Sequence, residues 1–242
     1  MTYQRRLLTI LLVIGVAASG CVYWRLLKFK HQLDDFHENF AFQSDSTYTL
    51  VSRHPLLSGG DIDGIMEVEP TERATRGGLE WRDYAFAKEP PDGSPPLVYR
   101  FGFEDDLLAR IEFPTQFTLL YPDTMLTSLL ASLGQADVDK GERSARARLM
   151  REQLATALPD RRRLAAVLGP PVERDSSETG ERWIYRYRLD TTTQGKAERK
   201  RRARGEFDFG PDGELLSLEA ALGRHALSFD VEAARAADDR KE

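Results

Sequence analysis

The sequence predicts an α+β fold, in which an N-terminal membrane helix is followed by two units that each contain a helix and a three-stranded antiparallel meander. Three observations carry this prediction: an uncharged apolar run at 7–24, an aromatic strand pattern at 81–86 that occurs again at 183–187, and a proline-ended helix before each of those strands. The expected segments are a tether at 1–42, a first unit at 43–122, a helical connector at 123–158, a second unit at 159–230 and a disordered tail at 231–242.

The tether begins with an apolar run, Leu7 to Trp24, that follows two arginines. The run is long enough to span a membrane, and it also has the charged start and apolar centre of a secretory signal peptide. Residues 18–21, Ala-Ser-Gly-Cys, resemble a bacterial lipobox, which predicts a lipoprotein with lipidation at Cys21. The alternatives are an uncleaved transmembrane anchor and a first helix that only packs on the core.

An amphipathic helix is expected to continue beyond the run, and this continuity favours the anchor. Its apolar stripe recurs at steps of three and four residues and consists of Leu26, Phe29, Leu33, Phe36 and Phe40. The lipoprotein and the anchor both tether the remaining chain to a membrane. We expect a Gram-negative periplasm, because a chain whose single cysteine is Cys21 would be indifferent to its oxidants. A domain that faces the cytoplasm is the alternative.

Composition and motifs give no sign of an enzyme. The 242 residues are 41% hydrophobic and 30% charged, as is ordinary for a globular chain, and a net charge of −5 gives no global basic field for nucleic acid. One cysteine excludes a disulfide framework within the chain. The four histidines lack metalloprotease spacing, and no phosphate-binding or serine-hydrolase motif occurs. We therefore expect no catalytic residues, no metal site, no cofactor and no nucleic-acid partner.

The first unit is expected to start with a capped helix that runs from Asp61 to a stop at Pro70. An aromatic strand at 81–86 follows, and the proline-rich segment 89–96 can only be a loop. Strands at 98–103 and 107–113 then complete the meander across a turn. The polar segment 43–49 before the unit is expected to be a connector.

The second unit follows two segments with helical spacing, 124–133 and 143–158. Asp160 is placed to cap a helix that ends at Gly169, and an aromatic strand at 183–189 precedes a hairpin with arms at 206–209 and 215–218. Alignment of Pro70 with Pro171 brings Trp81 and Trp183 to within one residue of register. We therefore predict an internal repeat in which both tryptophans pack the core.

The second unit resembles a known family. The carrying segments are Leu164–Pro171, Trp183–Tyr187, Glu206–Phe209 and Gly213–Leu215, which look like the pattern of the outer-membrane assembly lipoprotein BamE, or SmpA/OmlA, family. The tandem arrangement is similar to the β-lactamase inhibitory protein. The likeness covers about residues 158–220 well and 55–114 loosely. It implies helices packed on a three-stranded antiparallel sheet, a membrane-attached periplasmic location and a role in holding protein partners or lipid headgroups.

The sharpest local feature is a basic segment between the first two strands of the second unit, at 196–204. We expect it to extend from the hairpin as a loop or short helix. The predicted residues for binding anions or a partner are Lys196, Arg199, Lys200, Arg201, Arg202 and Arg204. Guanidinium groups bind phosphates bidentately, and a polybasic segment gains about 1 kcal/mol per charge beside an anionic membrane. A solvated loop tip is the alternative.

The sequence as a whole predicts a non-catalytic, membrane-anchored envelope protein that binds protein partners or anionic phospholipid headgroups. Support of outer-membrane protein assembly is one form that this function could take. The alternative is an accessory or sensor subunit that is anchored in the inner membrane and has a periplasmic domain.

Overall fold

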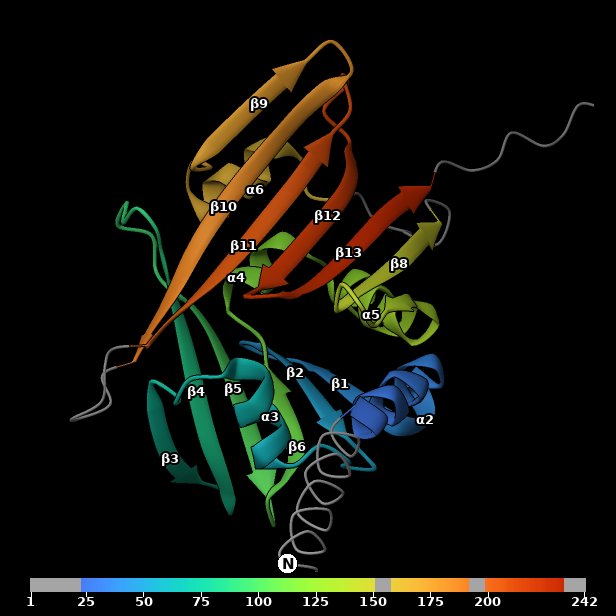
Figure 1. The fold of residues 1–242 in the computed structure, drawn as a ribbon, viewed down its shortest axis with the longest axis vertical. Helices are drawn as coiled ribbons and strands as arrows, with labels where there is room; N and C mark the ends of the chain where they lie inside the picture. The colour runs from blue at the N-terminus through green and yellow to red at the C-terminus, as the bar shows by residue number, and fades with distance from the viewer. Residues whose placement is uncertain (1–22, 151–157, 192–198, 233–242) are drawn as a thin grey trace, which may run out of the picture.

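The computed structural model describes residues 23–150, 158–191 and 199–232, and in them one sheet dominates the fold (Figure 1). The strands are β1 (Phe40–Ser44), β2 (Tyr48–Ser52), β3 (Glu72–Arg76), β4 (Leu79–Lys88), β5 (Leu97–Glu104), β6 (Leu107–Glu112), β7 (Asp137–Asp139), β8 (Ser144–Met150), β9 (Glu173–Ser177), β10 (Gly180–Thr191), β11 (Arg199–Phe209), β12 (Leu215–Leu222) and β13 (His225–Glu232). The helices are α2 (Phe36–Asn39), α3 (Gly59–Met66), α4 (Gln116–Leu120), α5 (Asp123–Ser132) and α6 (Arg161–Leu168), with a 3-10 turn η1 (Leu133–Gln135).

The sheet contains all 13 of these strands, in the order β1-β2-β6-β5-β4-β10-β11-β12-β13-β8-β7, while β3 pairs with β4 and β9 pairs with β10. Each half contains a helix followed by four strands, α3-β3-β4-β5-β6 and α6-β9-β10-β11-β12. The halves join where the ends of β4 and β10 pair, with Lys88 opposite Tyr187 and Phe86 opposite Leu189. β4 therefore pairs with β5 of its own half on one side and with β10 on the other, while β10 pairs with β11 of its own half and with β4.

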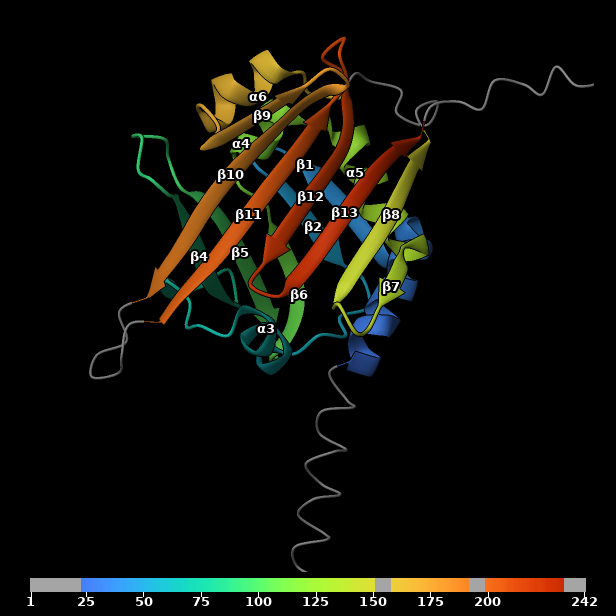
Figure 2. The same cartoon turned by 45° about the horizontal axis from the view of Figure 1, so that its top comes forward.

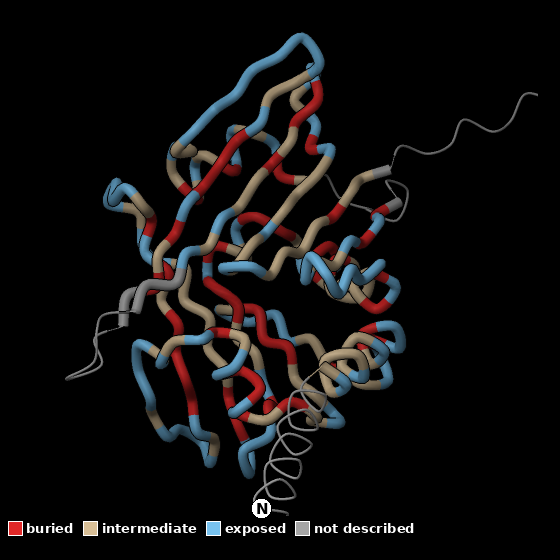
Figure 3. Tube along the Cα trace, in the orientation of Figure 1, coloured by how far each residue is buried: buried red, intermediate tan, exposed pale blue. Residues whose placement is uncertain are grey.

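The predicted fold class is therefore wrong, because the chain forms one large mixed sheet rather than separate helix-plus-three-strand units. Local patterns missed β3 and β9 because these strands bury almost nothing and so have no apolar alternation, as their exposed colour in Figure 3 shows. They also missed the β1–β2 hairpin, which occupies most of the expected connector at 43–49.

The prediction of a transmembrane helix is also corrected. Within residues 23–150, 158–191 and 199–232, no helix is both long and apolar enough to cross a membrane. The apolar run at 7–24 lies almost entirely outside these ranges, as does Cys21. Residues 23–34 are helical, and Leu33 is buried while Leu26 and Phe29 pack against the core. The predicted amphipathic stripe therefore faces the protein, although its last member, Phe40, already belongs to β1.

Polar contacts and close backbone packing fix this N-terminal helix to the rest of the molecule. Arg25 donates two hydrogen bonds to the carboxylate of Asp61, from Nε at 2.7 Å and from Nη2 at 2.6 Å. The helix also presses on η1, since a Cβ added to Gly134 would lie 2.2 Å from the backbone nitrogen of Asp34. Asp61 is only 1% exposed and also completes a capping box with Ser58 at the start of α3.

The predicted helix at 143–158 is wrong over its described part. Residues 144–150 form β8, which pairs in parallel with β13. The sequence there alternates with period two: Ala147 and Leu149 are buried, whereas Arg146 and Arg148 are exposed. Strand β13 extends to Glu232, so the first residues of the expected tail are ordered. The helices expected at 124–133 and after Asp160 are confirmed as α5 and α6, and Asp160 caps α6 through the backbone N–H of Arg163.

Trp81 and Trp183 are both buried, but they lie on opposite faces of the sheet, and of the two Trp183 alone belongs to the hydrophobic core cluster, so the prediction that both pack the core is wrong for Trp81. Side chains alternate along a strand, and the Lys88–Tyr187 pair sets which faces of β4 and β10 correspond. Trp183 is an even number of residues from Tyr187, whereas Trp81 is an odd number from Lys88. An offset of one residue inverts every face, so tryptophans aligned to within one residue are not structural equivalents.

Candidate functional site: an open arginine face

One face of β10 and β11 is covered by the core, and the other is largely open, although Ile184 is buried on it. The core-facing side chains of β10 are Trp183, Tyr185, Tyr187 and Leu189, and the hydroxyl of Tyr185 donates to the carbonyl of Gly169 at the end of α6. The intervening residues therefore occupy the opposite face. Figure 2 shows this face towards the viewer, with α4 and α6 behind the strands, and no helix of the described chain covers it.

Four arginines form a block on the open face. Arg186 on β10 lies directly opposite Arg204 on β11, and Arg188 lies directly opposite Arg202. Their side chains are 44%, 47%, 32% and 79% exposed, in that order. Like charges placed directly opposite each other destabilise a strand pair. These four residues are called the arginine block below. Repulsion between them destabilises the pairing of β10 with β11 locally, and other contacts must offset this repulsion.

Three carboxylates around the arginine block offset part of that repulsion. Glu173 lies 2.6 Å from Arg186, Glu206 lies 2.9 Å from Arg204, and Glu89 lies 3.1 Å from Arg188 and 3.9 Å from Arg202. The neighbouring Arg182 is held 2.6 Å from Asp208. These contacts hold the guanidinium groups in defined positions. Four ordered guanidinium groups can bind an anion with little reorganisation.

The structure corrects the expected conformation of the basic segment. Residues 199–204 belong to β11 and pair with 186–191 of β10, so they form neither a loop nor a short helix. Of the six predicted binding residues, Arg202 and Arg204 lie in the arginine block. Lys196 is outside the described residues, and for Arg199, Lys200 and Arg201 the backbone pairing alone is described.

Sequence reasoning missed Arg186, Arg188 and their carboxylate partners. A usable signal was present, because Arg186 and Arg188 alternate with Tyr185, Tyr187 and Leu189 and must therefore face away from the core. What the sequence could not supply was the pairing with β11, which turns two separated charge patterns into one block.

Other parts of the described chain offer less chemistry. The residues that the structure describes contain no group of three or more histidines, cysteines or acids placed to hold a metal ion. An open hollow of about 380 Å³ beside the N-terminal helix is lined by Lys28, His31, Gln32, Asp35, Asn39 and Leu56.

The comparisons with known proteins add no neighbour: no family model, no curated protein and no solved structure matches this chain. The resemblance to the BamE family consequently stays a prediction that rests on short motifs. The fold and the site together define a protein built on one large mixed sheet, one face of which carries ordered charges.

Proposed function

We propose that this chain is a non-catalytic binding protein that docks an acidic segment of a protein partner on the arginine block. The observation that carries the proposal is the direct opposition of Arg186 with Arg204 and of Arg188 with Arg202. Such an arrangement is unfavourable in the isolated protein and becomes favourable when carboxylates of a partner are added between the arginines.

A protein partner fits this face better than a lipid surface does. The arginine block is interrupted by Glu173 and Glu206, and Asp208 lies beside it. A bilayer presents a uniform layer of anions that would meet these carboxylates as well as the arginines. A peptide can place its own carboxylates against the guanidinium groups and leave the acidic positions free, which gives both attraction and selection.

The proposed location is the cell envelope, with a lipid on Cys21 as the tether. It is supported by the small residues that precede Cys21 and by the charged start of the apolar run. We expect the mass of the purified N-terminal peptide to include a diacylglyceryl group on Cys21, whereas an intact Met1 would reject the lipid.

A labelled ten-residue glutamate peptide tests the arginine block directly. The Arg186→Gln/Arg204→Gln variant should bind this peptide at least tenfold more weakly at low salt, a loss of about 1.4 kcal/mol, because charged hydrogen bonds contribute about that much or more each. Fluorescence anisotropy measures the dissociation constant. The stability of the variant should change by no more than about 0.5 kcal/mol, because two exposed and mutually opposed charges are removed together.

The matched control is Arg110→Gln/Arg162→Gln, which removes two exposed arginines from β6 and α6. It lowers the net charge equally and should leave peptide binding nearly unchanged. Equal weakening in both variants would mean that only net charge matters and would reject the site. The same would follow if anionic vesicles, but not the peptide, depended on Arg186 and Arg204.

A further inference from the structure

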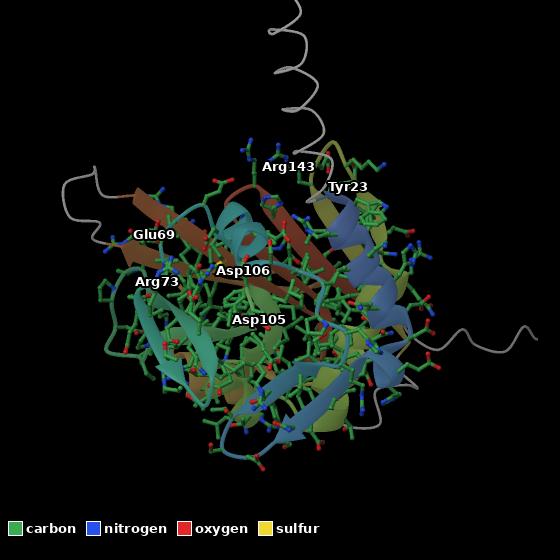
Figure 4. The ribbon with its side chains drawn as sticks, turned by 90° about the horizontal axis from the view of Figure 1, so that it is seen from below. Tyr23, Glu69, Arg73, Asp105, Asp106 and Arg143 are labelled. Carbon is green, nitrogen blue, oxygen red and sulfur yellow. The ribbon has the colours of Figure 1, made fainter. Side chains whose placement is uncertain are left out.

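A second surface lies where the chain enters its first described helix, at one end of the molecule. The turn between β7 and β8 reaches this point, since Lys140 Nζ lies 5.0 Å from the ring centroid of Tyr23. The turn between β12 and β13 adjoins it, because the backbone N–H of Ala226 donates to the carbonyl of Arg143 at 3.2 Å. Figure 4 shows Tyr23 and Arg143 near each other, beside the start of the helix. We call this surface the N-terminal rim.

The rim carries an exposed tryptophan. Trp24 is 56% exposed, whereas Trp81 and Trp183 are 8% and 4% exposed. The ammonium group of Lys28 lies 3.6 Å from the Trp24 ring centroid. Burial of a large indole is favourable, so an exposed Trp24 would gain free energy from contact with an apolar partner. A tryptophan beside a lysine is typical of the boundary between a membrane and water.

The rim is also locally positive on a chain of net charge −5. Its cations are Lys28, Lys140, Arg143 and Arg224, and its acids are Glu67, Asp139 and Glu142. Two of the acids are already engaged: Glu67 lies 3.7 Å from Arg224, and the carboxylate of Asp139 accepts hydrogen bonds from the backbone N–H groups of 141 and 142. In Figure 4 the acidic turn of Asp105 and Asp106 lies apart from Tyr23 and Arg143.

We propose that the N-terminal rim rests on an anionic phospholipid bilayer, with Trp24 at the level of the headgroups and Lys140 and Arg143 on phosphates. The order of the chain supports this occupant, because Trp24 lies three residues after Cys21, where the lipid tether is proposed. The inference goes beyond the proposed function, since it assigns a different surface and a different class of partner. In Figure 2 the open face points towards the viewer while the N-terminal end of the described chain is at the bottom, so the two surfaces point in different directions. A protein docked on the arginine block would therefore lie beside this chain and not between it and the bilayer.

Tryptophan fluorescence of the full chain tests the rim, because Trp24 is the one exposed indole of the three. Vesicles of phosphatidylcholine alone are compared with vesicles that contain one quarter phosphatidylglycerol. We expect a blue shift on binding, quenching by brominated lipid, and loss of both in Trp24→Phe. Binding should be at least tenfold tighter to the anionic vesicles at low salt.

The Lys140→Gln/Arg143→Gln variant distinguishes membrane binding by the rim from membrane binding by the N-terminal tether. It should lose about tenfold in affinity for anionic vesicles and nothing for neutral ones, while Arg110→Gln/Arg162→Gln should keep the anionic preference. Lys28 is left in place because its contact with Trp24 would change the emission itself. The proposal would be overturned if the native chain bound both vesicle types equally or if brominated lipid did not quench Trp24. It would also be overturned if both charge variants lost the same affinity for anionic vesicles. Both charge variants should retain the far-ultraviolet circular dichroism of the native chain.

Discussion

Lys88 shows how one residue joins the two halves of the sheet. Its side chain is only 3% exposed, and its ammonium group donates to the carbonyls of Leu168 at 2.8 Å and Pro170 at 2.6 Å and to the carboxylate of Asp92. Leu168 is the last residue of α6 and Pro170 lies just beyond it, at the helix end where free carbonyls favour a cation. A residue of the first half therefore completes a helix of the second half.

The pH dependence of stability should report this contact. The hydrogen bond from Lys88, followed by one from Ser94, lowers the pKa of Asp92 to about 2, from an ordinary value near 3.9. A depressed carboxyl pKa stabilises the fold above the unfolded pKa, and this contribution is lost as the pH falls from about 4 to about 2. Between pH 4 and pH 2 the free energy of unfolding of Asp92→Asn should therefore fall by about 1 kcal/mol less than that of the native chain, after allowance for partial exposure. Urea unfolding at each pH measures it.

Lys88→Met is the companion variant, because it raises the pKa of Asp92 towards its ordinary value while keeping the carboxyl itself. It should flatten the same part of the pH profile as Asp92→Asn does. Asp61 provides an internal reference in every variant. Burial would raise the pKa of Asp61, but the hydrogen bonds from Arg25 and Ser58 outweigh burial and hold it below its ordinary value. If the free energy of unfolding fell equally between pH 4 and pH 2 in the native chain, Asp92→Asn and Lys88→Met, the pH dependence would not arise from Asp92.

At the scale of elements, the sequence predicts best those segments whose pattern is set by their own core contacts. The aromatic strand at 183–189, the turn before Leu215 and the cap at Asp160 could all be predicted, because periodicity and capping are local. Strand β8 was missed for a different reason. Alternating alanine and arginine fit a helix by propensity, and only the parallel partner β13 makes the period of two decisive.

The candidate site divides in the same way. Arg202 and Arg204 could be found from the basic run, since charge density is visible in one stretch of sequence. Arg186 and Arg188 could not be joined to them, because the register between β10 and β11 is set by the pairing of the two strands and not by either stretch of sequence alone. The same limit hid the pairing of β4 with β10, which is what makes one sheet out of two predicted units.

At the scale of the whole molecule, the two halves share one interior. The buried cluster includes residues from both halves, among them Phe103 from β5 and Phe207 from β11. The hydroxyl of Tyr48 in β2 donates to the carbonyl of Tyr121 at 2.8 Å, which links the first edge of the sheet to the segment between α4 and α5. A chain of this length often unfolds domain by domain, but a shared core removes the boundary at which one half could open alone.

We therefore expect a single cooperative unfolding transition. The tryptophans allow this to be checked from both sides of the β4–β10 seam: Trp24→Phe/Trp183→Phe leaves Trp81 as the reporter of the first half, and Trp24→Phe/Trp81→Phe leaves Trp183 as the reporter of the second. In each variant the urea midpoint from fluorescence should coincide with its own midpoint from far-ultraviolet circular dichroism. The comparison is made within each protein because shortening a buried tryptophan changes its stability. A fluorescence midpoint displaced from the circular dichroism midpoint in either variant would show that the halves unfold separately, and that the three residue pairs between β4 and β10 do not couple them.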